Sequence, residues 1–78
     1  MKDKFIVGDL VWYKGSDRKL VYFNGQPLNL KIKQYSAGLI LSPKFYYLYS
    51  NKYKYKVYFF IYGIADMLES RLSLSKNE

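Results

Sequence analysis

The chain has 78 residues and a formal net charge of +7, and half of its residues are hydrophobic. A chain of this length encloses one core, so we expect a single domain over residues 1–74 with a polar tail at 75–78. Cysteine and histidine are absent, which excludes disulfides, the usual zinc ligand sets and the most common general base near neutral pH. We therefore expect a non-enzymatic protein with no cofactor and no metal.

The chain also lacks the signals of membrane insertion or export. Its N-terminal apolar stretch is interrupted by Gly8 and Asp9, unlike the apolar region of a secretory signal. The longest apolar run, at residues 57–65, is much shorter than the roughly 20 residues of a membrane-spanning helix. The sequence predicts a protein that stays inside the cell.

The predicted elements begin with a strand at residues 5–14, in which Gly8 and Asp9 mark a turn or bulge. A hairpin follows, with strands at residues 20–23 and 26–35, because Asn24-Gly25 suits the positive φ angles of a tight turn. Residues 37–42 predict a further strand, which ends before Pro43. These elements indicate an all-β chain.

Residues 44–63 hold most of the aromatic side chains, with lysines between them. If Ser50-Asn51 is the tip of a hairpin, Leu48 opposes Tyr53 and Tyr46 opposes Tyr55 on one face. The other face then holds Phe45, Tyr47 and Tyr49 opposite Lys56, Lys54 and Lys52. Residues 57–62 lack alternation and predict a central strand that is covered on both sides.

The C-terminal region, residues 64–74, fits two structures. A helix is indicated by the spacing of its apolar residues and by Asp66 and Glu69, which resemble a capping box. A strand, a short 3₁₀ turn and a second strand fit the same residues about as well.

Three segments carry a family resemblance: FIVGDLV at residues 5–11, AGLIL at 37–41 and YKVYFF at 55–60. Together they resemble small SH3-like barrel proteins of tailed bacteriophages, including phages of marine cyanobacteria. The resemblance implies an antiparallel barrel of about five strands, with residues 69–74 as the short turn and last strand. The hairpin near residues 20–35 is an addition to that pattern. From this barrel pattern together with an aromatic content larger than a small core can bury, we expect a host or virion protein as partner, in the cytoplasm of the infected cell or in the virion.

The candidate binding surface combines aromatic rings with ammonium groups. Its members are Phe45, Tyr47, Tyr49, Lys52, Lys54 and Lys56, with Trp12 and Tyr13 as a second candidate patch. Nucleic-acid bases stack on aromatic rings while lysines neutralise phosphates. The simpler alternatives are that tyrosines cover a small barrel, lysines keep it soluble, and Trp12 belongs to the core or rim.

Two main functions follow from these features. One is a protein-interaction module that binds an acidic protein surface, as the charge indicates. The other is a basic barrel that binds nucleic acid through the interleaved lysines and tyrosines. Self-association through the edge of the hairpin at residues 20–35 is a third interpretation. Asp66 and Glu69 form the one close acidic pair, for which capping is a simpler role than catalysis or metal binding.

Overall fold

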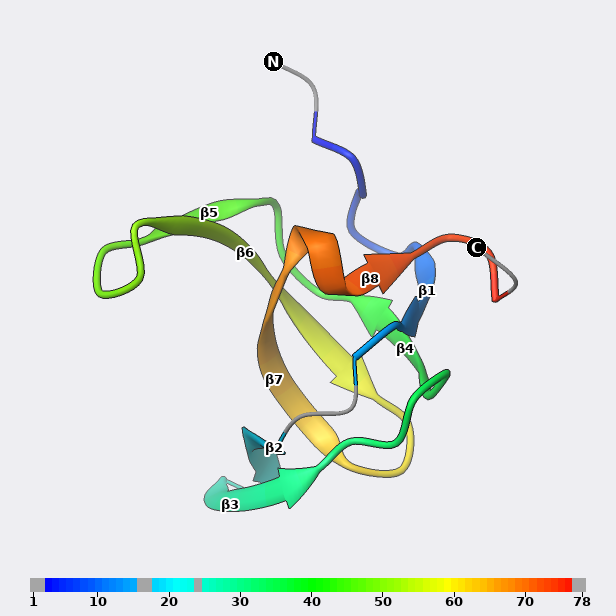
Figure 1. Cartoon of the computed structure of the whole chain (residues 1–78), viewed down its shortest axis with the longest axis vertical. Coiled ribbons are helices and arrows are strands. Elements are labelled where there is room, and N and C mark those ends of the chain that lie inside the picture. The colour runs from blue at the N-terminus through cyan, green and yellow to red at the C-terminus, as the bar shows by residue number, and fades with distance from the viewer. Residues whose placement is uncertain (1–2, 16–17, 24, 77–78) are drawn as a thin grey trace.

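The computed structural model describes residues 3–15, 18–23 and 25–76, and it consists of eight strands and one short 3₁₀ turn (Figure 1). The strands are β1 (Leu10–Tyr13), β2 (Arg18–Phe23), β3 (Gln26–Lys31), β4 (Ala37–Ile40), β5 (Phe45–Tyr47), β6 (Lys52–Phe59), β7 (Gly63–Leu68) and β8 (Leu72–Ser73). The 3₁₀ turn η1 (Glu69–Arg71) connects β7 to β8. The predicted all-β class is confirmed.

The strands form one antiparallel sheet that is an open path and does not close on itself. Its order is β3-β2-β7-β6-β4-β1-β8, and β5 pairs with β6 beside this path. β6 has three partners, β4, β5 and β7, so it is the central strand. The predicted central strand at residues 57–62 coincides with β6 only at residues 57–59. The number of strands is larger than the roughly five expected for the barrel. The predicted hairpin adds β2 and β3, and the aromatic stretch adds the short β5.

The sheet is curled, and its two end strands, β3 and β8, lie apart in space (Figure 1). In Figure 1, β6 and β7 run through the middle, the β2–β3 hairpin lies at the bottom, and β1, β4 and β8 gather to the right of the centre. The β5–β6 hairpin projects to the left, away from the rest of the sheet.

The first strand is shorter than predicted, because the chain turns before it. The Asp9 N–H donates to the Ile6 carbonyl oxygen (3.0 Å), and the Ile6 N–H donates to the Asp9 carboxylate (2.9 Å). Gly8 has a φ of +95°, which favours glycine. The turn indicated by Gly8-Asp9 is confirmed, and β1 begins only at Leu10.

The hairpin of β2 and β3 is present where the sequence predicted it. The two strands are paired from Phe23 opposite Gln26 to Arg18 opposite Lys31. Gly25 has a φ of +77°, and Asn24 lies outside the described residues. β3 ends at Lys31, so residues 32–35 of the predicted strand are not part of it.

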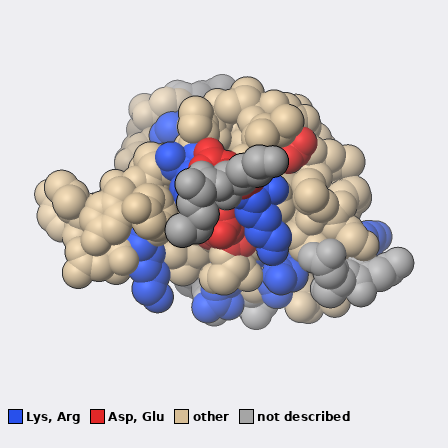
Figure 2. All heavy atoms as spheres, turned by 90° about the horizontal axis from the view of Figure 1, so that it is seen from above, with Lys and Arg blue, Asp and Glu red and all other residues tan. Residues whose placement is uncertain are grey.

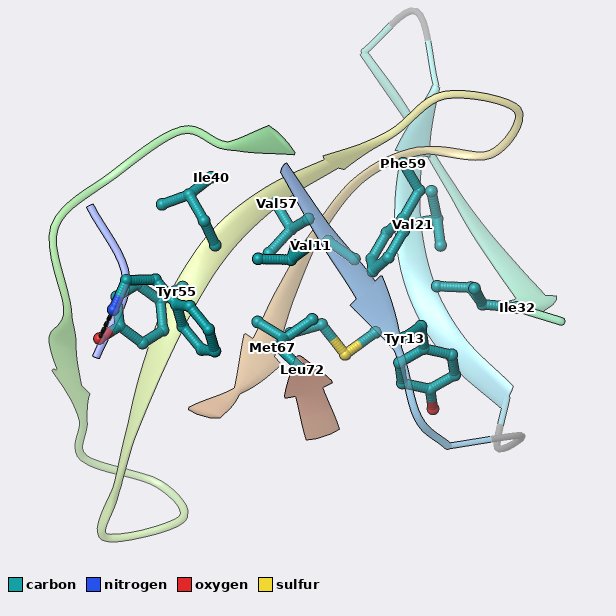
Figure 3. Packing of buried hydrophobic residues seen from close by; sticks show 12 residues of the cluster. Val11, Tyr13, Val21, Ile32, Ile40, Tyr55, Val57, Phe59, Met67 and Leu72 are labelled. Atoms are coloured by element: carbon teal, nitrogen blue, oxygen red, sulfur yellow. Dashed lines mark hydrogen bonds between the residues drawn. The ribbon is translucent and has the colours of Figure 1, made fainter. Parts of the chain in front are cut away.

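The core lies inside the curl of the sheet (Figure 3). It consists of Phe5, Val11, Tyr13, Val21, Ile32, Ile40, Tyr55, Val57, Phe59, Ala65, Met67 and Leu72. Members from one strand are two residues apart, as in Val11 and Tyr13, so each strand points alternate side chains inward and outward.

The prediction that residues 57–62 are covered on both sides is wrong. From Tyr55 to Phe59, β6 alternates between buried and exposed residues, and residues 60–62 form a turn in which Ile61 is 83% exposed. The continuous apolar run thus reflects an exposed apolar face and turn, which a hydrophobicity pattern cannot distinguish from full burial.

The C-terminal region is strand, 3₁₀ turn and strand, and the helical alternative is not found. β7 alternates strictly between buried and half-buried residues. No side chain caps η1, so Asp66 and Glu69 do not form a capping box. Among the described residues no helix has the length and apolar character needed to cross a membrane.

Candidate functional site

The outer face of the sheet carries a row of apolar side chains that crosses five neighbouring strands. We call this row the apolar band. It consists of Leu10 on β1, Leu39 on β4, Tyr58 on β6, Ile64 on β7 and Tyr22 on β2, and each residue lies directly opposite the next. Residues directly opposite each other point to the same face of a sheet. The band is therefore continuous from β1 to β2.

The apolar band is accessible along its length. Leu10, Tyr58 and Tyr22 are 43%, 39% and 48% exposed, and Leu39 and Ile64 are half-buried. The ring of Phe60, also exposed, lies 5.8 Å from the ring of Tyr58 and widens the band. No described element covers it, and exposed apolar side chains that adjoin one another are typical of a binding surface.

The two residues of the second candidate patch lie on opposite faces of β1. Trp12 is half-buried and is two residues from Leu10, so it points to the same outer face as the apolar band. Tyr13 is fully buried in the core, and its ring packs edge-on against Phe59 at 5.9 Å. The prediction that Tyr13 is a surface residue is therefore wrong, because strand alternation separates it from Trp12.

The aromatic hairpin has a different register from the predicted one. Phe45 opposes Lys54, Tyr46 opposes Tyr53, and Tyr47 opposes Lys52, which is a shift of two residues. Lys56 instead opposes Asp66 on β7.

Because the shift is even, Phe45, Tyr47, Lys52 and Lys54 still share one face, as predicted. Tyr49 lies in the loop and is 93% exposed, and its ring lies 5.6 Å from that of Tyr47.

The same hairpin, with β7 and β2, encloses a groove of about 450 Å³ on the outer face. We call it the hairpin groove. Its lining is Tyr22, Tyr47, Ser50, Lys52, Lys54, Asp66 and Leu68. The groove thus collects three of the predicted surface residues, Tyr47, Lys52 and Lys54.

The three predicted lysines differ in their electrostatic partners. The Lys56 ammonium lies 3.3 Å from the Asp66 carboxylate, so each offsets the charge of the other. The Lys54 ammonium lies 4.1 Å from the centre of the Tyr47 ring, a cation–π contact. Lys52 is exposed, and in the part of the chain that the structure describes neither Lys52 nor Lys54 has a carboxylate within 4.0 Å.

No family model, curated protein or solved structure matches this chain.

A second cluster lies on the inner side of the same hairpin and involves acidic groups. The Lys44 ammonium lies 3.8 Å from the Glu69 carboxylate, 4.0 Å from that of Asp3 and 5.0 Å from the Tyr53 ring centre. The Tyr55 hydroxyl donates to Glu69 (2.8 Å), and burial with this acidic neighbour raises the Tyr55 pKa. These contacts attach the N-terminal segment to β6 and η1.

Acidic and basic side chains lie close together on this part of the surface (Figure 2). Figure 2 shows acidic atoms near the middle of the face seen from above, with basic atoms on either side. Asp66 and Glu69, which are close in the sequence, have different partners: Asp66 contacts Lys56, whereas Glu69 contacts Tyr55 and Lys44. The described residues contain no group of three His, Cys, Asp or Glu side chains arranged to hold a metal ion.

The apolar band is not apparent from the sequence. Its five members are far apart in the sequence and are each ordinary strand residues, so no motif marks them. The signal was the alternation itself: each member is next to a core residue, as Leu10 is next to Val11 and Tyr58 next to Val57. Joining them into one row requires the register of four strand pairs.

Proposed function

We propose that the protein is a non-enzymatic interaction module that binds an acidic protein surface through the apolar band. The observation that carries this proposal is the continuity of the band across β1, β4, β6, β7 and β2, with three of its five side chains exposed. Burying such a row against a partner removes apolar surface from water, which is the main favourable term in most protein association.

The charge of the chain indicates what kind of protein would cover the band. A second copy would bring +7 against +7, and this repulsion opposes association of the chain with itself. A partner with a net negative surface is instead attracted over several ångströms before contact. Self-association through the edge strand β3 stays a prediction. Pro27 lies on this strand and has no N–H to donate, so it weakens pairing of β3 with a strand of a second copy.

We further propose that the fold is a variant of the SH3-like barrel of tailed phages in which the sheet stays open, and that the partner is a host or virion protein. The three resembling segments correspond to the start of the chain through β1, to β4, and to β6. The chain then continues through β7 and the η1 turn to β8, which pairs with β1. This agrees with the short turn and last strand that the resemblance implies. On this proposal the protein works in the cytoplasm of an infected cell or in the virion.

Removal of the apolar band tests the function. Leu10→Ser with Tyr58→Ser deletes two exposed apolar side chains and leaves the core unchanged. The immobilised protein captures partners from a host lysate or from disrupted virions, mass spectrometry identifies them, and calorimetry then measures the purified pair. We expect a one-to-one complex with an acidic protein, whose Kd rises at least tenfold in the double variant, as for an interface hot spot.

A control variant removes two exposed apolar side chains outside the band. Leu48→Ser with Ile61→Ser changes two residues that are even more exposed and lie in loops. We expect this control to bind like the unaltered protein, and the affinity of both to fall with rising salt. If the two double variants bind equally well, or if the purified partner is basic, the proposal is wrong.

A further inference from the structure

We infer that the hairpin groove is a binding site for single-stranded nucleic acid, separate from the protein-binding role of the apolar band. The groove has about 450 Å³ of space and places aromatic rings beside ammonium groups. Tyr22 is common to the groove and to the end of the band. Lys52, Lys54 and Tyr47 belong to the groove alone, so the two roles are separable by substitution.

Aromatic rings line the groove from two elements that are distant in the sequence. Tyr22 comes from β2 and Tyr47 from β5, and the exposed Tyr49 ring extends the aromatic surface beside Tyr47. Bases stack on such rings with little dependence on sequence, because every base has a flat face. In a duplex these faces are already stacked on neighbouring bases, so the rings favour single strands.

The charges of the groove suit a phosphate backbone. Lys52 and Lys54 have no carboxylate within 4.0 Å among the described residues, so their charges are available to phosphates. The Lys54 ammonium lies over one face of the Tyr47 ring, so a base would stack on the other face with this cation close by. The one acidic group of the lining, Asp66, is offset by Lys56 at 3.3 Å. These four side chains therefore carry three positive charges and one negative charge.

Binding through two basic contacts should be weak and should decrease moderately as the salt concentration rises. Each neutralised phosphate of a single strand contributes about −0.7 to the slope of log K against log salt concentration. The groove therefore predicts a slope between about −1 and −2. An anionic lipid or a polyphosphate would satisfy the lysines but would leave the aromatic rings without a stacking partner.

Fluorescence anisotropy with a labelled oligonucleotide of about 12 nucleotides, within the site size of small binding folds, tests the inference. At about 50 mM salt we expect saturable binding that Lys52→Glu with Lys54→Glu abolishes. Tyr47→Leu keeps the lysines and should lower the affinity about tenfold through lost stacking. An abasic strand of equal charge should also bind about tenfold less tightly.

The matched control is Lys33→Glu with Lys76→Glu, which makes the same change in net charge at two exposed lysines outside the groove. We expect it to keep the affinity within about threefold at the higher end of the salt range, where long-range charge is screened. Thermal unfolding of each variant identifies any loss of fold. The inference is overturned by absence of binding at about 50 mM salt, by equal binding of abasic or duplex DNA, or by equal losses in the two double variants.

Discussion

At the scale of single residues, Tyr55 joins three parts of the chain. Its buried hydroxyl accepts a hydrogen bond from the Phe5 N–H (3.3 Å, Figure 3) and donates one to the Glu69 carboxylate (2.8 Å). Its ring packs edge-on against that of Phe5 at 5.2 Å. Lys44 in turn lies 3.8 Å from Glu69. Tyr55 therefore holds the N-terminal segment and η1 against β6.

Replacing Tyr55 with phenylalanine should lower the free energy of unfolding by about 1–3 kcal/mol. The ring and its packing remain, but the buried Phe5 N–H loses its acceptor and Glu69 loses its donor. Urea denaturation near pH 8, followed by circular dichroism, measures the difference. Equal stability of the two proteins at this pH would contradict the role assigned to the hydroxyl.

The difference in the free energy of unfolding between the unaltered protein and the Tyr55→Phe variant should also depend on pH. Burial and Glu69 raise the pKa of Tyr55 above its ordinary value of 10.0, so the unfolded chain loses this proton first. The folded state then holds more protons, and stability falls as pH rises. The advantage of tyrosine over phenylalanine should be complete below pH 10 and should shrink above it. Comparison of the two proteins cancels the titration of the lysines.

Part of this arrangement was predictable from the sequence. The aromatic type of Tyr55 and its place in an alternating stretch predict a strand residue. Its partners are separated from it by 50 residues, for Phe5, and by 14, for Glu69. No local pattern specifies such contacts, since they depend on how the sheet curls.

At the scale of elements, the loop of the β5–β6 hairpin shows how register is decided. The Ser50 N–H donates to the Tyr47 carbonyl oxygen (3.3 Å), Asn51 has a φ of +54°, and the Tyr46 hydroxyl donates to the Asn51 side chain (2.9 Å). The loop therefore spans residues 48–51, and the two-residue tip predicted at Ser50-Asn51 is wrong.

The faces of this hairpin were nevertheless predicted correctly, because parity is set by the alternation of the sequence. Phe45 and Tyr47 lie on the face of Lys52 and Lys54 in either register. The position of the loop depends on side-chain contacts such as that of Tyr46 with Asn51.

Gly63 begins β7 at the point where this strand meets β2. Its φ is +118°, and a Cβ atom there would lie 2.5 Å from the Tyr22 carbonyl oxygen. Gly63→Ala should therefore destabilise the fold by about 3 kcal/mol, through both backbone strain and a clash with main chain. Thermal or urea unfolding measures the loss.

Gly25 provides the matched control for Gly63. It has a positive φ of +77°, but a Cβ atom added there would have no atom within 4 Å. Gly25→Ala should cost only the backbone strain, about 1 kcal/mol. Losses of equal size in the two variants would show that the close approach to Tyr22 is unimportant.

At the scale of the whole molecule, one curled sheet separates a buried inner face from an outer face that carries the apolar band. The all-β class was predictable from alternation and turn residues, and the basic charge from composition, because neither depends on contacts between distant residues. The band was not predictable in the same way, since Leu10, Leu39 and Tyr58 become neighbours only through the pairing of β1, β4 and β6.

The most direct test of the account is site-specific photo-crosslinking from the apolar band. A photoreactive phenylalanine derivative replaces Tyr58 in one protein and the exposed Ile61 in another, and both are irradiated in host lysate or with disrupted virions. We predict one discrete product from position 58, which contains an acidic protein, and no such product from position 61. Identical products from both positions, or a product that contains only a second copy of the chain, would contradict the proposed function.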